Sequence, residues 1–230
     1  MLSGCSSADA KSTTGAPLGG LLGSRSETLD ILGLLTILTL LPSILIMFTS
    51  FTRIIIVLSF VRNALGLQQM PPNQVLTGIA LILTFFVMSP VLSDIDKNAY
   101  QPYVANKITQ EQAVEKALEP VRDFMFRQTY KEDLQFFEGV AKVKAEKLED
   151  IPTEVLMPAF VTSEIKRAFQ IGFLIYIPFI VIDMIVASAL MSMGMMMLPP
   201  TVISLPFKIL LFVLVDGWIL TIQTLITGFG

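Results

Sequence analysis

The sequence contains no histidine, a single cysteine, Cys5, and only 15% charged residues. The absence of histidine excludes most metal sites, most general-base schemes and any histidine-containing catalytic triad. A lone cysteine cannot form an intrachain disulfide or a cysteine-based zinc site. The patterns GxSxG and HExxH are also absent, so we expect neither an enzyme nor a bound metal or cofactor. The net charge of −3 is too small to favour nucleic-acid binding.

Charge is concentrated in one part of the chain, because 25 of the 35 charged residues lie between Asp94 and Arg167. Long apolar stretches flank this part, and the mean hydropathy is +0.70. In the stretch 172–218, only Asp183, Lys208 and Asp216 carry a charge at neutral pH. A soluble domain of this length cannot bury so much apolar helix. The sequence therefore predicts an all-α integral membrane protein.

We expect four parts in the chain. They are a flexible N-terminal tail (1–28), a first apolar helical block (29–93), a polar helical insert (94–160) and a second apolar helical block with a Met-rich loop (161–230). The tail is rich in Ser, Gly, Thr and Ala, which is typical of poorly ordered segments. Its start resembles the end of a lipoprotein cleavage site, but the apolar region that should precede such a site is missing.

The two apolar blocks predict about four long helices, kinked and forming hairpins. No charge occurs in 31–52, which as a helix would span about 33 Å, with a kink at Pro42. A short apolar run between Arg53 and Arg62 leads to a loop, and the second long helix covers 73–88. The third is expected to begin near Thr162, with Glu164 in its first turn, and to end near residue 193. The fourth covers 206–226.

The insert has the pattern of short amphipathic helices. Thr109 and Gln112 have capping-box spacing, and Pro120 is expected to interrupt the helix that they begin. Apolar stripes that include Phe124 and Phe137 either pack on one another within the chain or pack between subunits. An insert of this size is too small for a large core of its own, which favours sharing. We therefore predict oligomer contacts at Phe124 and Phe137, with Glu164 near the interface.

The run Met195, Met196 and Met197 lies between the third and fourth helices, where a polar loop would be expected. Methionine is flexible and polarizable, so a ring of methionines could close a pore and still adapt to a passing chain. The alternative is an apolar turn that packs against lipid or against another helix.

The isolated charges Lys208, Asp183 and Asp216 need partners in apolar surroundings. We predict salt bridges between helices or between subunits, with Lys208 and Asp216 two turns apart on one helix. The rival interpretation is a proton relay, although no chain of ionisable residues links the three. Arg53 is interpreted as an interfacial residue that reaches for lipid headgroups.

Several ordered strings in the chain resemble the FliP family (FliP/SctR), over about 31–229. They are MFTSFTRI (47–54), ALGLQQ (64–69), PNQ (72–74), LTG (76–78), PAFVTSE (158–164), AFQIGF (168–173), GMMM (194–197), LPFK (205–208) and DGW (216–218). Virulence-secretion relatives share the FQIGF and MMM strings, whereas DMIVAS (183–188) resembles the flagellar branch.

The resemblance implies a core subunit of the flagellar type III protein export gate. Several copies, about five by the family's precedent, would assemble with FliQ, FliR and other flagellar export apparatus proteins. Unfolded substrates would cross the bacterial inner membrane at the basal body, and lipid would surround the assembly. The family favours the pore-closing interpretation of the methionines. The positive charges at Arg53 and Arg62 favour a periplasmic insert.

Two alternatives remain. The chain could be the equivalent subunit of a virulence (injectisome) secretion system. An ion channel or transporter is less favoured, because no selectivity ring, polar-lined broken helix or internal repeat is visible.

Overall fold

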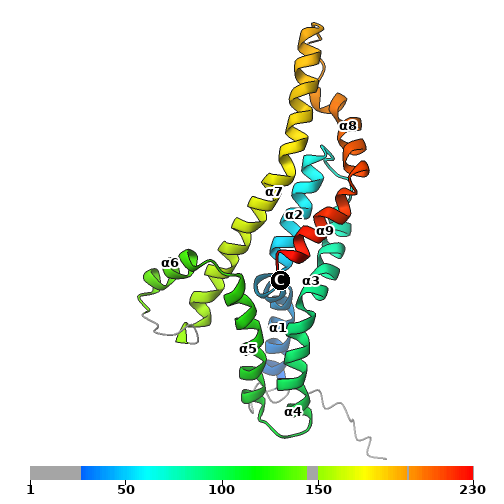
Figure 1. Ribbon diagram of the computed structural model, residues 1–230. Helices are drawn as coiled ribbons and strands as arrows, with labels where there is room; N and C mark the ends of the chain where they lie inside the picture. The colour runs from blue at the N-terminus through cyan, green and yellow to red at the C-terminus, as the bar shows by residue number, and fades with distance from the viewer. Residues whose placement is uncertain (1–26, 144–149, 196, 230) are drawn as a thin grey trace, which may run out of the picture. The chain divides into compact units, whose positions relative to one another are not determined.

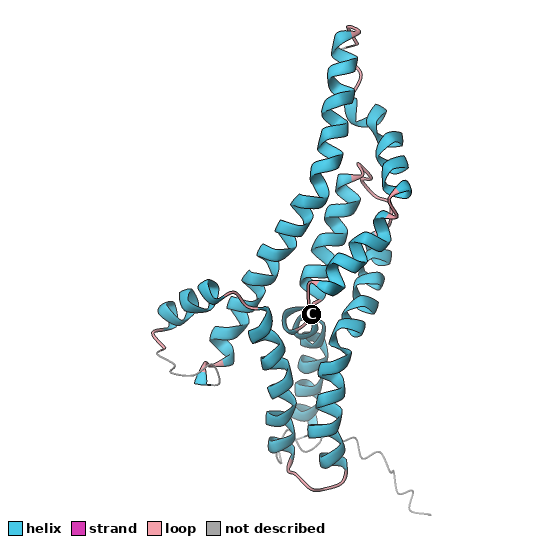
Figure 2. Cartoon of the chain, in the orientation of Figure 1, coloured by secondary structure: helices cyan, strands magenta, loops and turns pink. Residues whose placement is uncertain are grey.

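The structure is a computed structural model in which residues 27–143, 150–195 and 197–229 are described. Within these ranges all regular structure is helical (Figures 1 and 2), which confirms the predicted all-α class. The elements are, in chain order, α1 (Glu27–Phe48), α2 (Phe51–Ala64), α3 (Asn73–Ile95), the π-helix η1 (Asp96–Tyr100), α4 (Gln101–Val104), α5 (Gln110–Gln128), α6 (Lys131–Ala141), α7 (Thr153–Ser192), α8 (Pro200–Leu214) and α9 (Gly217–Thr227).

The chain divides into two compact units, residues 1–42 and 43–230. The described part of the first unit is the N-terminal portion of α1, where apolar side chains such as Ile31, Leu35 and Leu38 are exposed. Position 42 lies inside α1, so the proline there does not end the helix. An apolar helix with this exposure requires lipid or another protein to cover it.

Helix α7 organises the second unit, because it contributes buried residues to three hydrophobic clusters. The first part of α7 packs with α3, α5 and α6. Its middle packs with α2, α3 and α9, where Ala168 is fully buried. Further along, Phe179 packs with the end of α2 and with Phe212 of α8. Helix α7 therefore packs against the polar insert with its first part and against α8 and α9 with its later part.

Helices α2 and α7 approach each other closely at Gly172. A Cβ atom at this position would lie 2.5 Å from Cγ of Phe60 on α2. The ring of Phe60 also meets Phe169 edge-on, with the centroids 5.1 Å apart. Only glycine fits this contact without moving one helix away from the other.

The insert contains the predicted capping box. Thr109 Oγ1 accepts a hydrogen bond from the Gln112 backbone N–H at 3.4 Å, and Gln112 Oε1 accepts one from the Thr109 N–H at 3.1 Å. The predicted interruption at Pro120 is wrong, because α5 continues through it to Gln128. Beyond the proline, Phe124 and Met125 are buried in the cluster shared with α7, and this packing holds the helix together.

Two predicted boundaries in the second apolar block are also wrong. Helix α7 begins at Thr153 rather than near Thr162, and it runs through Pro158 and Pro178. Glu164 is therefore well inside the helix and not in its first turn. The predicted fourth helix is two helices, α8 and α9, which are bent by 62° about the break between them.

By length and composition, two helical segments among the described residues could cross a membrane, 73–104 and 153–192. The bent pair α8 and α9 would make a third if it acts as one span. The predicted number of about four long helices is not confirmed by the spans among the described residues.

Candidate functional site

A partly buried ion pair joins the two arms of the apolar hairpin, helices α7 and α8. Nζ of Lys208 on α8 lies 2.6 Å from Oδ2 of Asp183 on α7. Lys208 is only 3% exposed. The same Nζ donates a hydrogen bond to the Ala64 carbonyl at the end of α2, at 3.2 Å. Ser204 Oγ donates to Asp183 Oδ1 at 2.5 Å. The pair therefore fixes α8 against both α7 and α2, with hydrogen bonds to both charged groups.

Asp216 is not part of this pair. It lies between α8 and α9 in a left-handed backbone conformation, with φ of 51° and ψ of 48°. The prediction that it shares a helix with Lys208 is wrong, because α8 ends at Leu214. The Asp216 side chain is exposed and makes no hydrogen bond or ion pair with any residue that the structure describes.

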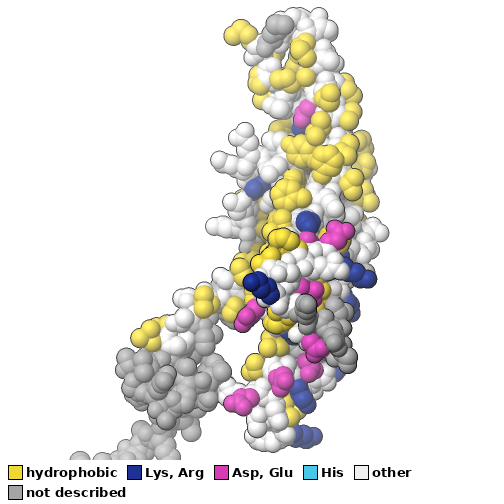
Figure 3. Space-filling model, turned by 90° about the vertical axis from the view of Figure 1, so that its left-hand side faces the viewer, with side chains coloured by type: hydrophobic (Ala, Val, Ile, Leu, Met, Phe, Trp, Pro, Cys, Tyr) yellow, Lys and Arg dark blue, Asp and Glu magenta, His cyan; other side chains and the backbone are white. Residues whose placement is uncertain are grey.

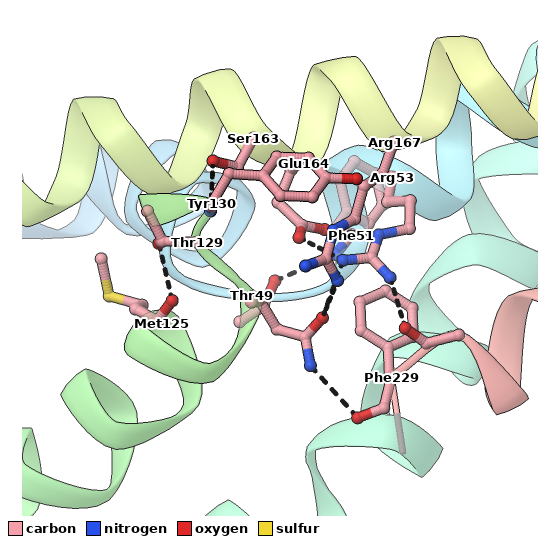
Figure 4. A network of polar contacts seen from close by, with 12 residues as sticks. Thr49, Phe51, Arg53, Met125, Thr129, Tyr130, Ser163, Glu164, Arg167 and Phe229 are labelled. Carbon is pink, nitrogen blue, oxygen red and sulfur yellow. Dashed lines mark hydrogen bonds and ion pairs between the residues drawn. The ribbon is translucent and has the colours of Figure 1, made fainter. Parts of the chain in front are cut away.

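The charged group that sequence reasoning missed is Arg53, in the first turn of α2. Its predicted role at a lipid interface is wrong, since the residue is 1% exposed. Figure 4 shows it facing Glu164 of α7. The contact is bidentate: Nε donates to Glu164 Oε2 at 2.9 Å, and Nη2 donates to Oε1. Bidentate geometry of this kind suits arginine and no other cation.

All three nitrogens of the Arg53 guanidinium are used. Nη2 also donates to Gln128 Oε1 at the end of α5, at 2.9 Å, and Nη1 donates to the Gly228 carbonyl at 2.9 Å. The ring of Phe229 lies 3.8 Å from the guanidinium carbon (Figure 4). Gln128 accepts a second hydrogen bond from Arg167 at 2.8 Å. One arginine thus holds α2, α5, α7 and the segment after α9 together.

A second polar contact attaches α6 to α7. Asp133, in the first turn of α6, is ion-paired with Lys166 and accepts a hydrogen bond from Ser163 Oγ at 2.7 Å. Ser163 in turn accepts from the Tyr130 backbone N–H at 3.0 Å (Figure 4). Burial by itself would raise the pKa of Asp133, but the hydrogen bonds from Lys166 and Ser163 and the charge of Lys166 hold that pKa below its ordinary value.

The three predicted oligomer contacts have different surroundings. Glu164 is fully buried against Arg53, and Phe124 is 4% exposed. The Phe124 ring packs on Phe160 and Phe229, with centroids 6.0 and 6.3 Å away. A single chain therefore buries both side chains, which is the alternative of packing within the chain. Phe137 is only partly buried and lies at the edge of the same cluster.

The predicted methionine run lies at the tip of the α7–α8 hairpin. Gly194 has a φ of +74°, which allows the chain to turn after α7. Met195 is 36% exposed and Met197 is 99% exposed, and Met196 lies outside the described residues. The described methionines of the run thus project from the protein and do not fill its core.

The surface beyond the polar insert is strongly apolar. In Figure 3 hydrophobic side chains gather over the upper part of the visible face, while most Lys, Arg, Asp and Glu side chains lie in the lower part. Exposed apolar residues recur along the length of the hairpin: Phe169, Phe173, Leu174, Val181, Met184, Ile185, Phe207, Leu210, Val213, Leu214 and Ile219. Helices of spanning length with such a surface define an all-α membrane protein.

Comparison with known proteins gives the family. A model of the FliP family matches residues 34–225. The flagellar biosynthetic protein FliP of Bacillus subtilis is 58% identical over 205 residues, which cover 89% of this chain and 93% of that protein. The protein of the same name from Pectobacterium carotovorum is 57% identical over 90% of this chain and 81% of its own length. The flagellar biosynthetic protein FliP of Aquifex aeolicus is 47% identical over 90% of this chain and 88% of its own length. The chain belongs to the FliP family.

Proposed function

We propose that the chain is a core subunit of the flagellar type III protein export gate. In this proposal several copies assemble with FliQ and FliR in the inner membrane at the flagellar basal body. Unfolded flagellar proteins cross through the assembly, so the chain is required for flagellum construction. Family membership over most of the chain and the flagellar role in the names of its relatives support this role.

The observation that carries the proposal is the exposed methionine run at the tip of the α7–α8 hairpin, whose two helices are joined by an ion pair. Met197 is almost fully exposed, whereas the ion pair of Lys208 and Asp183 fixes the hairpin arms below it. Thioether side chains have little capacity to hold water, so a ring of such tips would stay dry and block ions. The same side chains change rotamer easily, so the ring would yield to many different sequences.

The apolar surface of the hairpin supports assembly. A monomeric soluble protein does not expose a continuous apolar surface of this extent. We propose that neighbouring subunits cover part of it and lipid covers the rest. The insert, with most of the charge, would lie in the periplasm, where Phe137 at the edge of its cluster is available to a neighbouring copy.

The first experiment tests the role as a whole. The chain is expressed in a Bacillus subtilis strain that lacks its own FliP. We expect motility and flagellin secretion to return, because the two proteins are alike over nearly their whole lengths. Failure to restore either, with the chain present in the membrane at normal amount, would contradict a flagellar role. Restored secretion in a virulence-system deletion instead would favour the injectisome alternative.

The second experiment tests the seal. Alanine at positions 195, 196 and 197 should leave the yield of the purified complex unchanged but make the resting complex conduct ions. The matched control is alanine at Met191 and Met193, which are also exposed but lie just before the turn. The control should remain tight. A triple variant that assembles normally and conducts no more than the control would refute the seal.

A further inference from the structure

The charges of the apolar parts do not balance within one chain. Residues 54–93 and 168–229 contain four charged residues: Arg62, Asp183, Lys208 and Asp216. Asp183 and Lys208 pair with each other. Arg62 and Asp216 form no ion pair with any residue in the described part of the chain. One cation and one anion of the apolar parts therefore remain without an ion pair among the described residues.

The two remaining charges are close in sequence to residues of the same buried cluster. Val61, which precedes Arg62 on α2, packs in one cluster with Phe179 of α7 and Phe212 of α8. Phe212 also meets the ring of Trp218, with centroids 5.3 Å apart, and Asp216 lies between these two residues in sequence. Arg62 and Asp216 are thus at the same level along α7, yet the chain does not join them.

The Arg62 guanidinium is only partly satisfied. Its hydrogen bonds both come from Nη1, to Asn73 Oδ1 at 2.5 Å and to the Pro71 carbonyl at 3.4 Å. Nε is buried without an acceptor, and Nη2 makes no hydrogen bond with the residues that the structure describes. Arg53, in the first turn of the same helix, donates hydrogen bonds from all three of its guanidinium nitrogens. The half-used guanidinium of Arg62 has room for a further carboxylate.

The Asp216 carboxylate makes no hydrogen bond or ion pair with the described part of its own chain. The residue starts α9 and could cap it, but its side chain makes no cap hydrogen bond. It is exposed at the bend between α8 and α9. Its left-handed backbone is strained for a non-glycine residue, and it is followed by Gly217, which is packed against the Phe212 ring.

We propose that Arg62 of one copy binds Asp216 of the adjacent copy of this chain. The inference rests on the proposed function, in which copies lie side by side in one assembly. If adjacent copies lie at the same level, the cluster of Val61, Phe179 and Phe212 in one copy lies beside the same cluster in the next. Asp216 of one copy then comes close to Arg62 of its neighbour. A contact between two different patches is heterologous, and repetition of such a contact builds a ring or a helical array. A charge-assisted arginine–carboxylate contact would also fix the register between neighbours.

Crosslinking tests the pair directly. In a background with Cys5→Ser, one tagged copy carries Arg62→Cys and a differently tagged copy carries Asp216→Cys. A bifunctional thiol reagent, with a spacer about as long as an arginine side chain, is added to membranes that contain both copies. We expect a crosslinked product with both tags, at least fivefold above the control mixture of Asn63→Cys with Asp216→Cys. Asn63 is the exposed neighbour of Arg62 and lies on another face of the helix.

Charge reversal gives an independent measure. Arg62→Asp and Asp216→Arg should each lower the yield of the oligomer at least fivefold, and the variant with both changes should recover at least half of the parent yield. No crosslink above the control, or no recovery in the double variant, would overturn the proposal. Loss of yield only in membranes rich in anionic lipid, with no crosslink, would assign Arg62 to a headgroup and likewise overturn it.

The proposed function has its own separate outcome. If the unmodified chain restores motility but the crosslink fails, only the pairing is wrong. If the crosslink forms but motility is not restored, the pairing stands and the flagellar role is wrong.

Discussion

Removal of either partner of the buried Arg53–Glu164 pair should destabilise the chain far more than removal of both. With Glu164→Leu, the guanidinium of Arg53 stays 1% exposed and loses its counter-charge. With Arg53→Leu, the fully buried carboxylate is left alone. Breaking a buried pair from one side costs about 3–5 kcal/mol, which lowers the ratio of folded to unfolded protein by about two to three and a half powers of ten.

The double variant should be milder for reasons that the contacts specify. No buried charge remains, and two leucines fill much of the vacated volume. Gln128 keeps a donor, because Arg167 donates to the same oxygen at 2.8 Å. The Gly228 carbonyl loses its hydrogen bond from Arg53, but Gly228 is an exposed residue, so water can replace the donor and the loss costs about 0.5–1.5 kcal/mol. We therefore expect the double variant to be more stable than either single variant, by about 2 kcal/mol.

The assay is the rank order of resistance to heat and to protease of the full chain in detergent, together with its amount in the membrane. The control is Arg127→Leu, which removes an exposed arginine one position before Gln128 and should change stability by less than about 0.5 kcal/mol. The reasoning is refuted if the losses of the two single variants simply add in the double variant. Single variants as stable as the control would refute it as well.

Three further predictions follow from other contacts. Gly172→Ala should destabilise the α2–α7 contact by about 1–3 kcal/mol, measured by thermal stability of the purified complex, whereas Gly78→Ala should be harmless because nothing lies within 4 Å of the added carbon. Asp133 has a lowered pKa in the fold, so its stabilisation of α6 is present above the ordinary aspartate pKa and is lost as the pH falls through the lowered one; hydrogen exchange of α6 should show this loss, and Asp133→Asn should abolish it. Lys208→Glu should lower the complex yield strongly by placing two carboxylates together, and addition of Asp183→Lys should recover part of it; a silent Lys208→Glu would contradict the buried pair.

Local signals in the sequence predicted the elements that local physics determines. The capping box at Thr109 gives the start of α5, and the prolines before Asn73 give the start of α3. Proline gave a wrong prediction at Pro120, because α5 is held together there by packing. Helix α7 passes through Pro158 because Val155, Leu156, Ala159 and Phe160 on either side are buried against α3 and α5. An isolated segment would break there, but the tertiary contacts offset the lost hydrogen bond.

One boundary was missed although a signal for it exists. Asp216–Gly217 is a dipeptide typical of turns, and the structure breaks the predicted fourth helix at this pair. The apolar residues on both sides concealed the break, because α8 and α9 are equally apolar. Gly217 also has a tertiary cause, since a Cβ there would lie 2.3 Å from the Phe212 ring. This close approach joins residues of two helices and cannot be seen from spacing alone.

The pairing of charges is the part of the site that sequence could not decide, and arginine on α2 illustrates why. Apolar surroundings require that each charge has a partner, but they do not choose it. Arg53 and Arg62 are nine positions apart on one helix and bracket the same apolar run. Arg53 finds its carboxylate 111 positions away and also binds the chain's own last residues, so its donors are all used within the fold. Arg62 faces an asparagine and a carbonyl, so two of its nitrogens remain without acceptors among the described residues. Two arginines of the same helix thus differ in what they hold together. Arg53 stabilises the subunit, and Arg62 is available to bind a carboxylate of an adjacent copy.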